Sequence, residues 1–105
     1  MSIEQQAVER IAQTLRDKPA ANLMLATGST MEPVYALLRE ASLDFSLANT
    51  FNLDEYLDGN QFREFMNAQL FEHVNICAEN VHFPALGYDA LIAEAGGIDL
   101  CILGI

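Results

Sequence analysis

The sequence has 105 residues, a length that suggests one small domain over residues 1–105. Hydrophobic residues make up 51% and charged residues 19%, which permits a packed core and argues against a disordered chain. With 15 acidic against 5 basic residues, the formal net charge of −10 disfavours a nucleic-acid partner and a membrane surface. A small anionic ligand stays compatible with this charge, because backbone N–H groups at a helix N-terminus can hold an anion without lysine.

The sequence also carries information on compartment and metals. Its first six residues have no basic region and no apolar run, so no secretory signal is predicted. Cys77 and Cys101 have no CxxC partner, which predicts two reduced thiols in a cytoplasmic protein. His73 and His82 have no cysteine close to both, so the sequence predicts no metal site.

The first half of the chain alternates helical and extended patterns. Residues 3–15 predict a helix, with Ser2 as N-cap and Gln5 completing a capping box, and residues 17–19 (Asp-Lys-Pro) end it. Residues 23–26 (Leu-Met-Leu-Ala) predict a short strand covered on both faces. A polar turn at residues 27–30 and a helix over residues 32–40 come next.

The second half continues the alternation. We expect strands over residues 47–53, 81–83 and 98–105 and helices over residues 62–74 and 88–95, the last helix ended by two glycines. The apolar positions of the first of these helices are expected in the core: Phe62, Phe65, Met66, Leu70 and Val74. Alternating strands and helices indicate an α/β protein with a parallel sheet.

Two polar segments come directly after the first two predicted strands. The carboxyl ends of parallel strands share one edge of the sheet, so Thr27-Gly28-Ser29-Thr30 and Asp54-Glu55 are expected at the same edge. Gly28 lets a ligand approach the backbone, while Ser29 and Thr30 add hydroxyl donors beside the N-terminus of the next helix. The sequence therefore offers a candidate phosphate site without a lysine.

Each of these residues also has a structural explanation. A Gly-Ser-Thr turn that caps a helix is common, and an acidic residue after an apolar strand is often its first solvated position. Asp54 is otherwise a candidate general base, while the strand pattern points Glu55 the other way. His73 is expected to cap a helix end, and His82 to be packed or at the surface.

Five segments together resemble glucosamine-6-phosphate deaminase and the superfamily that also includes 6-phosphogluconolactonases. They are Leu-Ala-Thr-Gly-Ser-Thr (25–30), Phe-Asn-Leu-Asp-Glu-Tyr (51–56), Phe-Met-Asn-Ala-Gln-Leu-Phe-Glu-His-Val (65–74), Ala-Glu-Asn-Val-His (78–82) and Gly-Gly-Ile-Asp-Leu-Cys-Ile-Leu-Gly-Ile (96–105). Tyr56 favours the deaminase branch, because lactonases tend to carry Asp-Glu-Arg at the corresponding place.

The resemblance implies a three-layer Rossmann-like, mostly parallel sheet with flanking helices. It also implies conversion of glucosamine 6-phosphate to fructose 6-phosphate and ammonia by a deaminating aldose–ketose isomerisation. The family's general base matches Asp54, its phosphate-side turn matches Gly28, Ser29 and Thr30, and Thr27 and Glu55 are secondary candidates. A small phosphosugar is the implied partner, with no metal or redox cofactor, and a homo-oligomer is expected.

The sequence departs from the family in three places. The connections at residues 57–61 and 82–88 are short, and the sequence ends at Ile105, where the family continues into a Gly-x-Asn-Gly-His loop that opens the sugar ring. The resemblance thus matches an N-terminal portion with internal shortenings, and we expect negligible deaminase turnover from the chain alone.

Alternative functions therefore stay open. One is a non-catalytic phosphosugar-binding module, and another is a module that self-associates through the apolar strand at residues 98–105. A third is a hydrolase of the 6-phosphogluconolactonase type.

Overall fold

The computed structural model describes residues 2–26, 31–52, 61–83 and 87–102. The elements in chain order are α1 (Ile3–Asp17), β1 (Asn22–Leu25), α2 (Glu32–Glu40), β2 (Asn49–Asn52), α3 (Gln61–Met66), the π-helix η2 (Asn67–Phe71), the 3₁₀-helix η3 (Ala78–Asn80), β3 (Val81–His82), α4 (Tyr88–Glu94) and β4 (Leu100–Ile102). All the predicted helices and strands are present, so the α/β prediction is confirmed.

The start of α1 has the predicted capping box. The Ser2 hydroxyl accepts a hydrogen bond from the Gln5 backbone N–H at 3.1 Å, and the Gln5 side chain accepts one from the Ser2 N–H at 2.9 Å. Two N–H groups at the helix start are thereby satisfied. The helix ends at Asp17, two residues before Pro19, as the sequence predicts.

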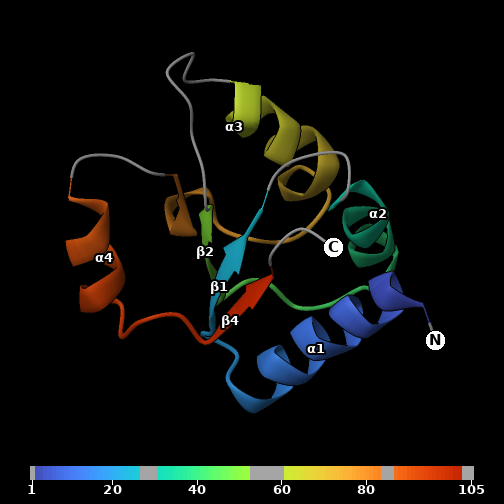
Figure 1. Ribbon diagram of the computed structural model, residues 1–105, viewed down its shortest axis with the longest axis horizontal. Coiled ribbons are helices and arrows are strands. Elements are labelled where there is room, and N and C mark those ends of the chain that lie inside the picture. The colour runs from blue at the N-terminus through green and yellow to red at the C-terminus, as the bar shows by residue number, and fades with distance from the viewer. Residues whose placement is uncertain (1, 27–30, 53–60, 84–86, 103–105) are drawn as a thin grey trace.

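The four strands form one parallel sheet in the order β3-β2-β1-β4. The chain passes from β1 outward to β2 and β3, and then returns so that β4 lies on the other side of β1. Helices α1, α2 and α3 lie on one face and α4 on the other (Figure 1). This three-layer arrangement is the Rossmann-like fold that the resemblance implied.

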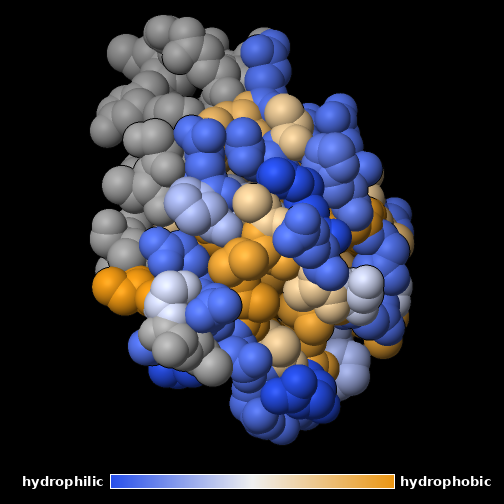
Figure 2. Space-filling model, turned by 90° about the vertical axis from the view of Figure 1, so that its right-hand side faces the viewer, coloured by the Kyte–Doolittle hydropathy of each residue, from blue (hydrophilic) through white to orange (hydrophobic). Residues whose placement is uncertain are grey.

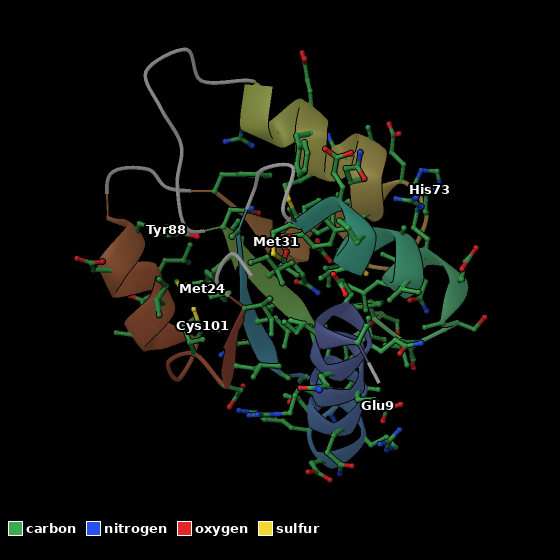
Figure 3. All side chains as sticks on the ribbon, turned by 45° about the vertical axis from the view of Figure 1, so that its right-hand side comes forward. Glu9, Met24, Met31, His73, Tyr88 and Cys101 are labelled. Carbon is green, nitrogen blue, oxygen red and sulfur yellow. The ribbon has the colours of Figure 1, made fainter. Side chains whose placement is uncertain are left out.

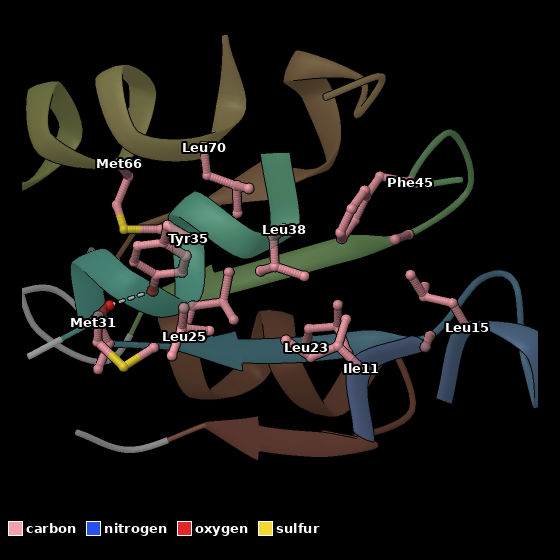
Figure 4. Close-up of a cluster of buried hydrophobic side chains, with 14 of the residues drawn as sticks. Ile11, Leu15, Leu23, Leu25, Met31, Tyr35, Leu38, Phe45, Met66 and Leu70 are labelled. Carbon is pink, nitrogen blue, oxygen red and sulfur yellow. Dashed lines mark hydrogen bonds between the residues drawn. The ribbon is translucent and has the colours of Figure 1, made fainter. Parts of the chain in front are cut away.

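The core fills the space between the sheet and α1, α2 and α3. Leu23 and Leu25 of β1 are about 1% exposed and point toward α2, where Tyr35 and Leu38 meet them (Figure 4). Met66 and Leu70 close the cluster from α3 and the π-helix as predicted, while Phe65 and Val74 are only partly buried against it. The helical segment ends at Phe71 rather than at residue 74. The side chain of Phe62 is outside the described part.

The strands β2 and β4 are shorter than predicted. β2 begins at Asn49 rather than at residue 47, and Leu47 is 60% exposed, so it takes no part in the core. β4 begins at Leu100 rather than at residue 98, because residues 98 and 99 still belong to the turn that brings the chain to β1. Apolar side chains alone therefore overestimate both strands at their amino ends.

The π-helix is a feature that the sequence did not predict. The Glu72 N–H donates to the Asn67 carbonyl at 3.0 Å, five residues back rather than four. Two side chains bind carbonyls of the widened turn: the Arg39 guanidinium donates to Gln69 O at 2.6 Å, and His73 Nε2 lies 2.9 Å from Ala68 O. The expectation that His73 caps a helix end is thereby confirmed.

At the amino end of the sheet, Asn22 is the centre of a hydrogen-bond network. Its Nδ2 donates to Ala95 O at 2.7 Å and to Gly97 O at 2.8 Å, and its Oδ1 accepts from Asn49 Nδ2 at 3.1 Å. The Asn22 N–H donates to Asp99 at 2.7 Å, and Asp99 also pairs with Lys18 at 3.1 Å. This network ties the turn after α4 to the start of β1.

Candidate ligand site at the carboxyl ends of the strands

The strand order defines where a ligand site is expected. Between β1 and β4 the direction in which successive strands are added reverses, and ligands of open α/β sheets bind at the carboxyl ends of the strands at such a point. The last residue of β1, Leu25, is paired with Asn52 of β2 on one side and Ile102 of β4 on the other. Three strands therefore end level at one edge, as the parallel-sheet prediction required.

The residues predicted to carry the chemistry lie outside the described part of the chain. They are Thr27, Gly28, Ser29 and Thr30 after β1, and Asp54 and Glu55 after β2. The described residues that flank these two segments define the geometry of this edge.

The helix after the first segment begins without a side-chain cap. Met31 is the N-cap residue of α2, and its thioether makes no hydrogen bond to the helix start. Glu32 and Pro33 occupy the first turn. Met31 lies beyond the carboxyl end of β1, whereas Leu15 lies near the other end of that strand (Figure 4). The first N–H groups of α2 are thus capped by no side chain at the N-cap position, an arrangement that suits an anion.

A buried tyrosine fixes the backbone just after β1. Tyr35 of α2 is 0% exposed, and its hydroxyl donates to the carbonyl of Ala26 (Figure 4). Burial raises the pKa of Tyr35 above its usual range, so the hydroxyl stays protonated and can donate this hydrogen bond. The last described residue before the first segment is therefore held by a side chain from the next helix.

Asn52 and Tyr88 play the corresponding part at the end of β2. Asn52 is 0% exposed, and its Nδ2 donates to Leu25 O at 3.3 Å, across from β2 to β1. The hydroxyl of Tyr88, the first residue of α4, donates to Asn52 O at 2.8 Å and lies 3.5 Å from His82 O. Figure 3 shows Tyr88 at the same end of the sheet as Met31.

The sequence pattern did not predict these contacts. In the sequence pattern, Tyr35 is only one of the apolar positions of a predicted helix. Tyr88 is only the first residue of another predicted helix. The available signal was Asn52, an amide between the apolar Phe51 and Leu53, since a buried amide needs hydrogen-bond partners.

The remaining candidates have structural roles. His82 stacks on Phe51 with ring centroids 4.7 Å apart, and burial lowers its pKa, which favours the neutral ring. The expectation of a packed histidine is confirmed. Cys77 and Cys101 are both free and exposed, as two reduced thiols would be.

Two further cavities are lined by residues that the structure describes. One, of about 340 Å³, is lined by Asn67 and Phe71 of the π-helix, by Val81 and by Phe83, over whose ring the Arg63 guanidinium lies at 4.5 Å. The other, of about 490 Å³, lies between α1 and α2. Figure 2 shows the face that carries the start of α1 and α2, with apolar side chains gathered at its centre and hydrophilic ones around them. Among the described helices, none is long and apolar enough to cross a membrane.

A parallel sheet in the order β3-β2-β1-β4, covered on both faces and with three strands ending level, defines the chain as a Rossmann-like α/β protein. No protein-family model matches it. Curated proteins do: the chain is 38% identical to a glucosamine-6-phosphate deaminase of Hahella chejuensis, over 99% of this chain and 47% of that protein. It is 44% identical to one of Rhodopirellula baltica, over 90% of this chain and 45% of that protein. The resemblance to glucosamine-6-phosphate deaminases is thereby confirmed.

The extent of these matches matters as much as their identity. The chain spans about half the length of the curated relatives it matches. The alignment with the Hahella chejuensis protein covers 122 positions, more than the 105 residues of this chain, so that relative has internal residues that this chain lacks. The internal shortenings inferred from the sequence agree with this difference.

A solved structure supports the same superfamily. The 6-phosphogluconolactonase of Thermotoga maritima superposes with a TM-score of 0.78 and 29% sequence identity. The match covers 95% of this chain and 54% of the lactonase. Similarity in sequence thus favours the deaminases, while the structural match is to a lactonase.

Proposed function

We propose that the chain binds a phosphosugar at the carboxyl end of its sheet and contributes to the deamination of glucosamine 6-phosphate. The products of that reaction are fructose 6-phosphate and ammonia. The proposal rests on one structural observation in particular, the paired ends of β1 and β2 at Leu25 and Asn52. The phosphate-side and proton-transfer segments both start from that pair of residues. Similarity to named deaminases over nearly the whole chain supports it.

In this proposal the two segments divide the work. Gly28, Ser29 and Thr30, with Thr27 as a secondary contact, hold the phosphate near the N-terminus of α2. Asp54 removes the proton from C2 of the ring-opened amino sugar and returns a proton at C1, and Glu55 has a secondary role. Water then hydrolyses the resulting imine at C2 to a ketone and releases ammonia. A fixed separation between the anchor and the base is what this isomerisation requires.

Binding tests the phosphosugar half of the proposal. We expect saturable binding of fructose 6-phosphate to the chain in a calorimetric titration. Gly28→Val should weaken this binding, because a branched side chain would occupy the space left for the phosphate. Asp54→Asn should leave it nearly unchanged and serves as the matched variant. Circular dichroism of both variants checks that they fold, and absence of binding by the unchanged chain at millimolar ligand would refute the proposal.

Turnover tests the chemical half. Ammonia release from glucosamine 6-phosphate is measured for the chain alone and for Asp54→Asn. Any release that depends on the chain should disappear in Asp54→Asn, since loss of a general base commonly costs about 10²- to 10⁴-fold in rate. Release that survives the substitution would rule out Asp54 as the base.

The lactonase match favours a second candidate function. The Thermotoga maritima 6-phosphogluconolactonase shares the fold at a TM-score of 0.78, so hydrolysis of 6-phosphogluconolactone is the alternative reaction. Lactone hydrolysis by the chain, without ammonia release from the amino sugar, would favour this alternative. The two substrates share a phosphate, so binding alone does not separate them.

Self-association through β4 is a further proposal for the same chain. In the described part of the sheet β4 is the last strand and pairs only with β1, so one edge of an apolar strand is open to a second copy. Oxidation tests this arrangement. In a Cys77→Ser variant, Cys101 should form a disulfide between two copies of the chain. In a Cys101→Ser variant, Cys77 should form none. Both thiols are exposed, so the pair is a matched control. A monomer at all concentrations would contradict it.

The proposed sugar-phosphate reaction also leads us to propose that the protein is cytoplasmic. Sugar phosphates are charged and are retained inside cells, and two exposed free thiols suit a reducing compartment. A fluorescent fusion observed in the native host would locate the protein directly.

A further inference from the structure

The amide of Asn52 occupies an unusual position for a polar side chain. It is 0% exposed at the last residue of β2 and shares a face with Leu25, its partner in β1, so it points into the layer beneath α2. Its Nδ2 donates to Leu25 O at 3.3 Å. Its Oδ1 is buried and has no hydrogen-bond partner among the residues that the structure describes. A leucine of similar size would remove this unpaired oxygen, together with the one long hydrogen bond to Leu25 O.

The backbone of the same residue is held from the opposite face. The Tyr88 hydroxyl donates to Asn52 O at 2.8 Å from α4, while the Asn52 amide reaches across to β1. Asn52 is thus tied to β1 through its side chain and to α4 through its carbonyl. Tyr35 extends the arrangement by donating to Ala26 O on the neighbouring strand.

A comparison within β2 shows how the Asn52 side chain differs from another buried polar side chain of the same strand. Thr50 lies two residues earlier on the same face, is also 0% exposed, and its Oγ1 likewise has no partner in the described part. Burying a polar atom without a hydrogen bond destabilises the folded state. Residues that reduce stability in this way are retained where function needs them. Of these two side chains, only that of Asn52 makes a hydrogen bond from β2 to β1 in the described part of the chain.

We propose that Asn52 is a positioning residue for the candidate ligand site. Its amide fixes the end of β2 against the end of β1, the two strands that lead into the proposed phosphate anchor and the proposed general base. Asn52 does not touch the ligand, because its side chain is fully buried. The inference rests on the proposed function, since it concerns the same site.

The test compares two isosteric substitutions on one strand, Asn52→Leu and Thr50→Val. Binding of fructose 6-phosphate is titrated and unfolding in urea is measured for each. Asn52→Leu should bind about tenfold more weakly or worse, because small displacements of a binding group are costly. Its unfolding midpoint should stay close to that of the unchanged chain, since the loss of the 3.3 Å hydrogen bond to Leu25 O is offset by removal of the unpaired buried oxygen. Thr50→Val should raise the midpoint and leave binding unchanged.

Tyr88→Phe provides an independent second variant. It removes only the hydroxyl that holds Asn52 O, and it should weaken binding in the same direction with the fold retained by circular dichroism. Unchanged binding in both Asn52→Leu and Tyr88→Phe would overturn the inference and leave the proposed function standing. A fall in binding that merely parallels a fall in the unfolding midpoint would show a structural role and would also overturn it. No binding by the unchanged chain would overturn both.

Discussion

The two ends of the sheet each carry a buried asparagine, and the two side chains differ in how many of their polar atoms form hydrogen bonds. At the amino end, Asn22 uses both amide N–H groups and its oxygen, in bonds of 2.7 Å, 2.8 Å and 3.1 Å. At the carboxyl end, Asn52 uses one N–H group in a 3.3 Å bond, and its Oδ1 has no partner in the described part of the chain. Both residues are almost completely buried.

This difference in hydrogen bonding distinguishes Asn22, which stabilises the fold, from Asn52, which lies at the proposed ligand site. A buried polar network that is fully satisfied holds the fold rigidly, and Asn22 does so for the turn that leads into β4. A network that is satisfied only in part is a cost to folding, and proteins tolerate such costs mainly at functional sites. The amino end therefore supports the sheet, while the carboxyl end, where we propose the ligand to bind, has a buried amide that is only partly hydrogen-bonded in the described part of the chain.

The largest expected effect is the loss of Asn22. Asn22→Leu leaves the Ala95 and Gly97 carbonyls and the Asn49 amide without their partner, so we expect the free energy of unfolding to fall by about 3 kcal/mol. Urea unfolding of Asn22→Leu beside Asn52→Leu measures the contrast. Equal losses in the two variants would mean that the two ends of the sheet do not differ.

The turn that Asn22 binds supplies the next test. Gly97 has φ +87°, and an added Cβ would meet nothing within 4 Å, so a side chain there is strained only through the backbone. We expect Gly97→Ala to cost about 1 to 2 kcal/mol in unfolding free energy. Gly97→Asn is the matched variant, because asparagine adopts this conformation more readily, and it should lose less. Equal losses would point to a cause other than backbone strain.

Acid should weaken the amino end first. The Asn22 N–H and, to a lesser degree, Lys18 hold the pKa of Asp99 below its usual range. A carboxylate whose pKa is lower in the folded than in the unfolded chain stabilises the fold above the unfolded value, and this contribution is lost as the pH falls through the folded value. Asp44, whose hydrogen bonds from Ser46 lower its pKa, adds to the acid sensitivity.

Unfolding free energies at about pH 7 and about pH 3 test this linkage. Asp99→Asn should reduce the difference in unfolding free energy between the two pH values. Asp89 is an exposed carboxylate on α4, so Asp89→Asn is the charge-matched control. An unaltered pH dependence in Asp99→Asn would contradict the assignment.

The smallest effect is expected from Thr50→Val. Removing a buried hydroxyl that has no partner in the described part should raise the free energy of unfolding by up to about 1 kcal/mol. The change is measured by urea unfolding. A loss of stability instead would show that Thr50 Oγ1 has a partner that matters, and would weaken the comparison with Asn52.

Local signals predicted the elements well. The helix over residues 32–40 has the predicted bounds, and the Ser2–Gln5 capping box forms as expected, because both depend on residues close in sequence. The parallel sheet could be predicted from alternation alone. Strand starts were less accurate, since Leu47 is apolar and yet 60% exposed.

The contacts that shape the candidate site could not be predicted in the same way. Tyr35, Asn52 and Tyr88 bind backbone carbonyls that lie far along the chain or on another strand, and a carbonyl has no sequence signature. The sheet edge that carries the candidate site could be predicted from topology. The residues that brace it required the tertiary structure.

The π-helix at Asn67–Phe71 has a consequence for how this chain tolerates insertions and deletions. The widened turn accommodates one more residue than an α-helical turn would, and Asn75 lies a short distance beyond its end. Asn75 accepts from the Phe45 N–H at 2.7 Å and donates to Asp44 at 3.0 Å. Deleting a single residue between positions 67 and 71 would remove the extra residue of the widened turn, restore an ordinary α-helical turn and leave the residues on both sides in phase. The hydrogen bonds between Asn75 and residues 44 and 45 would then persist. The same deletion within the regular helix α3 would instead rotate the downstream residues by about 100° around its axis.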